Sequence, residues 1–104
     1  MMLTYGIAQQ KFDGYIIMSV EYYRKKLIDL RADVKREQEA KKRDNERYAS
    51  LIKGTSIASS KASYRKQKID HAADHDRRIE SYKRQIESAK ESLARERASA
   101  ARRK

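Results

Sequence analysis

Hydrophobic residues in the first half of the chain recur every three or four positions, which places them on one face of an α-helix. In the 18–53 segment these spaced residues are Val20, Tyr23, Leu27, Leu30, Val34, Tyr48 and Leu51. In its middle the same face turns polar, through Glu37, Lys41 and Asp44. We therefore predict a helix over 18–53 whose apolar stripe contains a polar section.

The segment LIKGTSIASS, residues 51–60, interrupts this pattern. Gly54 follows the basic Lys53, and a glycine in the left-handed conformation commonly ends a helix. The Ser and Thr residues that follow can cap a second helix. We predict a turn over 54–60 and a second helix over 61–102. The apolar stripe of this second helix consists of Ile69, Ala72, Ile79, Tyr82, Ile86, Ala89 and Leu93.

A connector this short makes the two helices antiparallel neighbours. If the turn is centred near residue 57, Leu27 faces the neighbourhood of Ile86, and the polar stretch 37–44 faces another polar stretch, DHAADHDR, at 70–77. This agreement predicts an all-α fold, a long antiparallel two-helix coiled-coil hairpin. Its predicted interaction seam consists of Val20, Tyr23, Leu27, Leu30, Val34, Tyr48, Leu51, Ile69, Ile79, Tyr82, Ile86 and Leu93. Because such a hairpin buries one stripe per helix and has a polar middle layer, we expect it to self-associate or to dock on another helical protein.

The first seventeen residues differ in composition from the rest, because they contain one Lys and one Asp and no other charged residue. Ser19 can cap a helix that begins at Met18, and Glu21 suits the first turn of that helix. Residues 1–17 are therefore interpreted as a dispensable N-terminal extension. The alternative is a short strand or helix that packs its apolar residues, such as Phe12, onto the base of the hairpin.

Composition excludes several classes of protein. The chain has 104 residues, 39% of them charged, a net charge of +11, and no cysteine or proline. At this length and polarity we expect one domain without a thick core. Without cysteine there is no disulfide framework, and no run of about 18 apolar residues suggests a membrane span. The N-terminus lacks the pattern of a signal peptide, so we expect a cytoplasmic protein.

Two histidines are the only candidate metal ligands of note. His71 and His75 stand four residues apart on one helix face, a spacing that can bind zinc or nickel. No third His, no Cys and no suitably placed Glu completes an enzyme signature. The alternative is a polar layer at the seam that fixes the register of the two helices. We predict no cofactor and no catalytic residue.

Basic residues cluster along both helices, and a sequence pI near 10.0 is compatible with binding to nucleic acid. The candidate contacts are Lys41, Lys42, Arg43, Arg77, Arg78, Lys83 and Arg84. Acidic residues are interspersed with these bases, as Glu80 is with Arg84, which is typical of a solvated helix face. No known DNA- or RNA-binding motif is present.

Two segments carry a resemblance to a known family. MSVEYYRKKLIDLRADV at 18–34 and IKGTSIASSKASYRKQKID at 52–70 resemble the N-terminal coiled-coil regions that precede Toll/interleukin-1 receptor (TIR) effector domains in bacterial defence-type proteins. The resemblance covers about residues 18–90 and implies an oligomerising or partner-sensing module, without the catalytic domain. The size and Gly54 also resemble the helical hairpins of the WXG family, but Ile52 stands where that family has Trp.

Taken together, the sequence predicts a non-enzymatic coiled-coil interaction or oligomerisation module, as in a bacterial defence-type system. Its partner is expected to be a second copy or another helical protein. The alternative is a basic accessory protein that binds nucleic acid by non-specific electrostatics.

Overall fold

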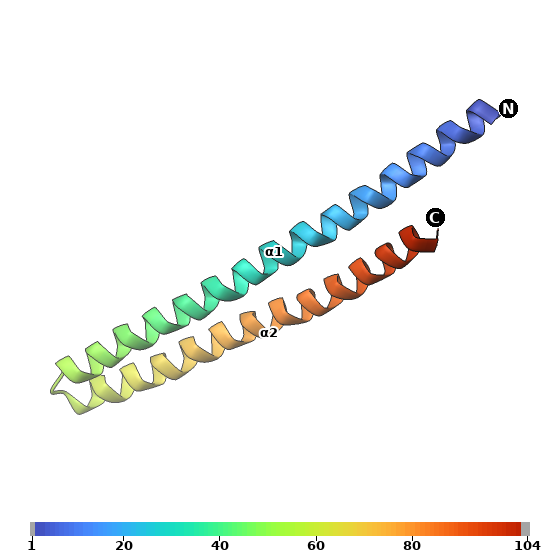
Figure 1. The fold of residues 1–104 in the computed structure, drawn as a ribbon. Coiled ribbons are helices and arrows are strands. Elements are labelled where there is room, and N and C mark those ends of the chain that lie inside the picture. The colour runs from blue at the N-terminus through green and yellow to red at the C-terminus, as the bar shows by residue number, and fades with distance from the viewer. Residues whose placement is uncertain (1, 103–104) are drawn as a thin grey trace. The chain divides into compact units, whose positions relative to one another are not determined.

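The chain folds into two long α-helices joined by a short linker (Figure 1). The computed structural model describes the backbone of residues 2–102 and the side chains of residues 19–102. Helix α1 spans Met2–Gly54, and helix α2 spans Ala58–Arg102. No described residue belongs to a strand. The predicted all-α helical hairpin is confirmed, whereas its coiled-coil character and its self-association stay predictions.

The linker comprises residues 55–57 and is shorter than the predicted turn over 54–60. Gly54 is the last residue of α1, and no glycine among the described residues has a positive φ, so the predicted left-handed cap is wrong. Thr55 shapes the turn instead, because its Oγ1 accepts a hydrogen bond from the Ile57 amide at 3.3 Å. The Ile57 carbonyl then accepts from the Lys61 amide at 3.0 Å, which starts α2 with Ile57 in place of a serine cap.

Helix α1 begins at Met2, sixteen residues before the predicted start at Met18. Ser19 therefore lies within the helix and is not its cap. No proline stands in this segment to break a helix, and apolar content alone does not stop one. The proposal that residues 1–17 are dispensable stays a prediction, and the packing of Phe12 and its neighbours lies outside the described side chains.

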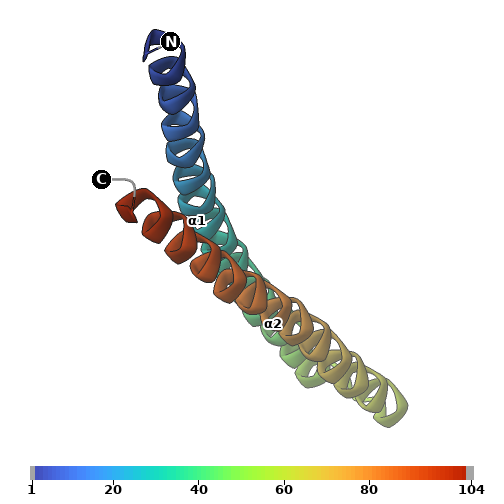
Figure 2. The same cartoon turned by 90° about the vertical axis from the view of Figure 1, so that its right-hand side faces the viewer.

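The chain divides into two compact units. The turn-proximal unit, Arg31–Arg84, contains the end of α1, the linker and the beginning of α2. In this unit the two helices lie side by side in both views (Figures 1 and 2). They are antiparallel, since Glu37 pairs with Arg78 whereas Asp44, further along α1, pairs with His75. Tyr48, His75 and Ile79 are its buried residues.

The terminal unit consists of Met1–Leu30 and Gln85–Lys104. Among the side chains described in this unit, the buried ones are Leu27 and Leu30 from α1, with Ala89 and Leu93 from α2. Each pair is three or four residues apart, so one stripe of each helix forms this core.

The burial of the twelve predicted seam residues separates into three groups. The buried ones are Leu27, Leu30, Tyr48, Ile79 and Leu93. The half-buried ones are Val20, Tyr23, Val34, Tyr82 and Ile86. Leu51 and Ile69 are 39% and 69% exposed, so their assignment to the seam is wrong. From Tyr48 the buried stripe continues four residues on, to half-buried Ile52, and from Ile79 it continues backwards through His75 and Ala72.

Candidate functional site

The most distinctive site in the described part of the chain is a buried histidine in the turn-proximal unit. His75 is the one polar residue in its core, with a relative exposure of 7%. It precedes Ile79 by four residues, so it occupies a seam position of α2. On α1 the seam positions after Val34 fall at Glu37, Lys41 and Asp44, where the spacing of three and four residues continues. The polar stretch of each helix therefore forms part of the seam itself.

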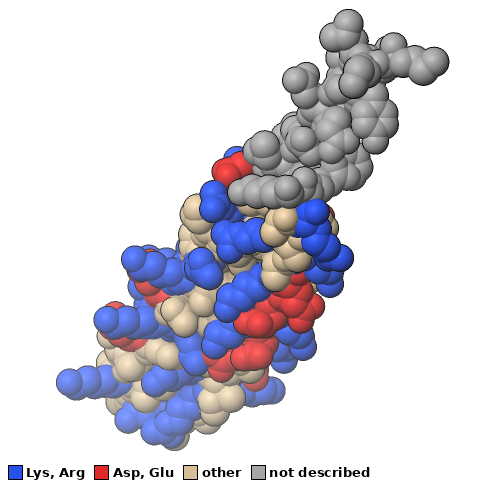
Figure 3. All heavy atoms as spheres, turned by 45° about the vertical axis from the view of Figure 1, so that its right-hand side comes forward, with Lys and Arg blue, Asp and Glu red and all other residues tan. Residues whose placement is uncertain are grey.

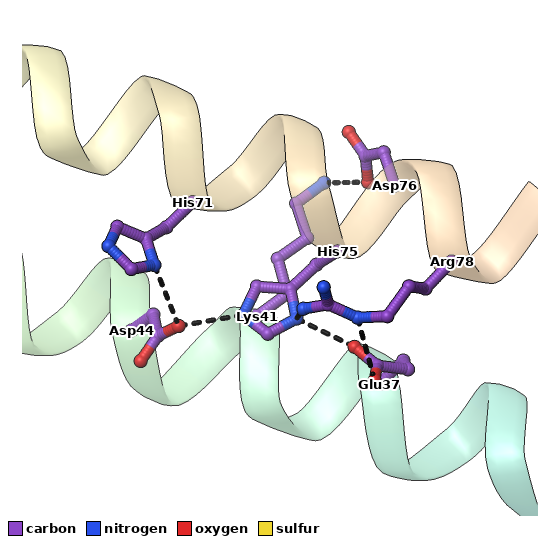
Figure 4. Close-up of polar contacts among 7 residues, drawn as sticks. All are labelled: Glu37, Lys41, Asp44, His71, His75, Asp76 and Arg78. Carbon is purple, nitrogen blue, oxygen red and sulfur yellow. Dashed lines mark hydrogen bonds and ion pairs between the residues drawn. The ribbon is translucent and has the colours of Figure 1, made fainter.

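Both ring nitrogens of His75 contact carboxylates of α1 (Figure 4). Nδ1 lies 2.7 Å from Glu37 Oε2, and Nε2 lies 2.7 Å from Asp44 Oδ2. A carboxylate only accepts, so both contacts are hydrogen bonds only when both nitrogens carry protons. The geometry therefore fits an imidazolium cation held between two anions. We call Glu37, Asp44 and His75 the charged layer.

Arg78 supports this layer from α2. Its Nε donates to Glu37 Oε1 at 3.0 Å, so Glu37 accepts from two cations at once. One of its terminal nitrogens also lies 3.0 Å from His75 Nδ1. Within the described side chains, no buried nitrogen or oxygen lacks a hydrogen-bond partner. The layer is thus fully satisfied, which is the condition under which a buried polar network is tolerated.

The hydrogen bonds shift the pKa values of all three members. The bonds to Asp44 and then to Glu37 raise the pKa of His75 above its ordinary 6.5, against the opposing effects of burial and of Arg78. The bond to His75 lowers the pKa of Glu37 and of Asp44, again against burial. A raised histidine pKa stabilises the fold fully below 6.5, and this contribution is lost as the pH rises through the folded-state pKa. The carboxylates contribute above their ordinary values of 4.5 and 3.8 and lose this contribution as the pH falls through their lowered pKa values.

Further polar contacts flank the layer (Figure 4). Lys41 Nζ donates to Asp76 Oδ1 at 2.7 Å across the two helices. His71 Nδ1 lies 4.0 Å from Asp44 Oδ2, and its ring lies 5.3 Å from the ring of Tyr48. These pairs join the stretches 37–44 and 70–77 that the sequence predicts to face each other. The contacts support the interpretation of a polar layer that fixes the helix register.

The second interpretation of the histidines, a metal site, receives no support from this geometry. No group of three His, Cys, Asp or Glu side chains among the described residues could hold a metal ion. The two nitrogens of His75 are already engaged with carboxylates, and His71 reaches only the edge of the layer. What the arrangement can do is couple helix pairing to protonation.

The structure separates the seven candidate nucleic-acid contacts into two groups. Lys41, Arg77 and Arg78 form ion pairs with Asp76, Asp74 and Glu37. The other four candidates, Lys42, Arg43, Lys83 and Arg84, form no ion pair with a described residue. Figure 3 shows Lys and Arg side chains spread over the visible face, with the largest group of acidic side chains toward its right-hand side and smaller ones elsewhere on it.

The seam list drawn from the sequence omits the members of the charged layer. It followed apolar residues, so it selected Ile69 and passed over His75, although counting back four residues from Ile79 reaches the histidine. The same count forward from Val34 reaches Glu37, then Lys41 and Asp44. Spacing was the signal that could have identified them, whereas hydropathy pointed elsewhere.

No protein-family model matches the chain, and comparisons with curated proteins and with solved structures give no significant match. The resemblance to the regions ahead of TIR domains therefore stays a prediction. No helix in the described part of the chain is both long and apolar enough to cross a membrane.

Proposed function

We propose that this chain is a non-enzymatic interaction module, a coiled-coil type of hairpin that self-associates or docks on another helical protein. The observation that carries the proposal is the thinness of its core. Among the described residues six hydrophobic side chains are buried, and none is less than 2% exposed. Large apolar side chains meanwhile lie outside the core, and they are Tyr22, Ile28, Leu51, Ile57 and Ile69.

A thin core favours assembly for a thermodynamic reason. One stripe per helix offsets little of the conformational entropy that two long helices lose on folding. Binding of a second helical surface to the folded hairpin stabilises it by mass action. The charged layer fits the same function, because buried polar residues in helical seams select register and partner at some cost in stability.

The absence of catalysis is also a proposal, supported by the occupation of His75. A general base needs a ring nitrogen free to take a proton from a substrate. Both nitrogens of this buried histidine contact carboxylates of the same chain. On the resemblance to TIR-associated regions, the proposal also includes a cytoplasmic role in a bacterial defence-type system.

The test is the molar mass of the nuclease-treated chain, measured by light scattering coupled to size exclusion at low and moderate salt. The proposal predicts a discrete species of twice or four times the 12.2 kDa chain, free of nucleic acid. The mass of a single chain at every protein concentration would contradict self-association. If no helical protein bound the chain either, the whole proposal would be refuted.

Two matched aspartate variants connect assembly with the fold. Leu30→Asp places a charge at a side chain that is 6% exposed and should abolish both helicity and assembly. Ile28→Asp makes the same chemical change two residues earlier, where the side chain is 66% exposed, and should retain helicity. Retained helicity and assembly in Leu30→Asp would refute the helical seam.

Nucleic-acid binding is the second candidate, and the unpaired cations favour it. Lys42, Arg43, Lys83 and Arg84 are exposed and form no ion pair with a described residue, so phosphates can reach them. Binding of this kind weakens steeply with salt, since each neutralised phosphate releases counterions. In the same chromatography it predicts a single-chain protein that co-elutes with nucleic acid until salt removes it.

A further inference from the structure

The tip of the hairpin, residues 47–69, is uniformly basic. It contains six Lys and Arg residues and no Asp or Glu. None of these six cations forms an ion pair with a described residue. Arg47 contacts Tyr48, whose hydroxyl accepts a hydrogen bond from it at 3.1 Å, and its charge also helps to lower the pKa of Asp44. The tip therefore carries unneutralised positive charge, in contrast to the ion-paired middle of the same unit.

Apolar surface lies within this basic tip. Ile57 in the linker is 60% exposed, Leu51 is 39% exposed, and Ile69 is 69% exposed. A groove of about 430 Å³ opens between the two helices on the side of Ile69. Its lining residues are Asn45, Ile52, Arg65, Lys68, Ile69 and Ala72. Aliphatic side chains thus form its walls, and two cations stand among them.

We propose that this groove binds an acidic amphipathic helix of a partner protein. One wall of the groove belongs to α2, where the lining residues recur every three or four positions and so share one helix face: Arg65, Lys68, Ile69 and Ala72. The other wall contains Ile52 of α1. A helix laid along such a groove inserts apolar side chains at matching spacing. Acidic residues beside those anchors then meet Arg65 and Lys68, so charge and shape select the same partner.

Charge and shape together argue against the other occupants. A second copy carries the same net charge of +11 and, docked tip to tip, would bring an acid-free basic surface to the groove, so like charges disfavour that contact. Nucleic acid would use the cations but leaves the exposed Ile69 and Leu51 without a role. An anionic membrane would use both cations and apolar residues, but a flat surface does not fill a groove.

This inference rests on the proposed function, because it names the partner class for one surface of the interaction module. The two can fail separately. Molar mass reports self-association, whereas binding at the tip is measured with an added helix. A chain that assembles but does not bind the helix would contradict this inference alone, and a chain that does neither would contradict both.

The test uses the full chain and a fluorescent peptide of about 20 residues, long enough to hold a helix. The peptide has Leu at alternating three- and four-residue spacing and Glu at the flanking positions. A control peptide has Gln in place of every Glu. Fluorescence anisotropy should show saturable binding of the acidic peptide, binding that weakens with salt, and much weaker binding of the control peptide.

Two variants locate the binding, each with a matched control. Ile69→Gln removes the apolar wall, and Arg65→Gln/Lys68→Gln removes both cations; each should weaken binding roughly tenfold, as loss of an anchor side chain does. Ile28→Gln is the control for the first, because Ile28 is exposed to nearly the same degree, 66% against 69%. Lys83→Gln/Arg84→Gln removes the same charge from two exposed residues of α2 that lie more than ten residues beyond Ala72, the last residue that lines the groove. Both controls should bind as the wild type does, and all variants should keep the helical circular dichroism of the wild type.

Several results would overturn the proposal. These are equal losses in the groove variants and their controls, equal affinity for the two peptides, and absence of binding. Two further arms use duplex DNA and vesicles with anionic lipid. Binding to either one that depends on Ile69 and exceeds peptide binding would assign the groove to that ligand instead.

Discussion

Replacement of His75 by leucine tests what the charged layer contributes to stability. The substitution leaves Glu37 and Asp44 facing an apolar side chain at a site where His75 was 7% exposed. Each hydrogen bond to a charged group contributes about 1.5–3 kcal/mol, so the two bonds set an upper range of about 3–6 kcal/mol. The carboxylate side chains keep 20% and 29% of their surface exposed, so water can solvate them once the imidazolium is gone. We therefore expect His75→Leu to lower the free energy of unfolding by about 2 kcal/mol.

The triple variant Glu37→Leu/Asp44→Leu/His75→Leu separates the value of the pairing from the value of burial. It makes these three seam positions apolar, keeps Lys41 as the polar seam residue between Glu37 and Asp44, and leaves no uncompensated charge among the three positions. Replacement of a buried ionic triad by apolar residues is often neutral or stabilising by about 1–4 kcal/mol. We expect the triple variant to be at least as stable as the wild type, although the register of its two helices should be less specific.

The assay is urea unfolding followed by circular dichroism, at one fixed protein concentration because assembly makes stability depend on concentration. The pH is held between the ordinary pKa values of the carboxylates and of histidine. His71→Leu is the matched control, since it makes the same change four residues earlier, at a side chain 46% exposed. If His75→Leu cost no more than His71→Leu, the layer would not form as described. If the triple variant were as unstable as His75→Leu, the layer would be a net source of stability, and the specificity argument would be refuted.

Three further predictions follow from the same structure. Because the pKa of His75 is raised, the melting temperature should fall as the pH rises above 6.5, and this fall should disappear in His75→Leu. If the melting temperature of the variant fell with pH as steeply as that of the wild type, the histidine would be excluded as the cause. Gly54→Ala should stabilise the hairpin by about 0.4–1 kcal/mol, because Gly54 has no positive φ and an added Cβ meets nothing within 4 Å; destabilisation would show that the left-handed cap exists after all. Ile79→Ala should cost about 2 kcal/mol or more in urea unfolding, since Ile79 is 7% exposed, whereas Ile69→Ala, at 69% exposed, should change stability by less than about 0.5 kcal/mol.

The sequence predicted the architecture well because hydrophobic spacing and charge report on long helices directly. The regular recurrence of Leu27, Leu30 and Val34 requires a helix, and the short connector requires antiparallel neighbours. The facing of the polar stretches 37–44 and 70–77 also followed from pairing about the turn, and it is seen in the Lys41–Asp76 contact.

The details at the turn could not be predicted by the same reasoning. Gly54 satisfies a helix-ending pattern, yet the helix ends there without a left-handed residue, because Thr55 and Ile57 complete the turn through their own hydrogen bonds. Ile69 is apolar but lies one position away from the seam. The preceding residue, Lys68, takes the half-buried position instead. The position of a residue around the helix decides its burial here, whatever its hydropathy. Ile69 is therefore exposed and lines the groove.

The most direct test of the account is the protonation state of His75 in solution, measured by nitrogen NMR of the labelled chain, with His71→Gln used to assign the rings. We infer that His75, the one buried polar residue of the turn-proximal core, is a structural cation, an assignment that leaves the surface of the hairpin to carry function. It predicts that both ring nitrogens of His75 carry protons and that its pKa lies above 6.5. A ring that is neutral below pH 6.5, or that binds added zinc, would contradict the charged layer and reopen the metal site as the basis of function.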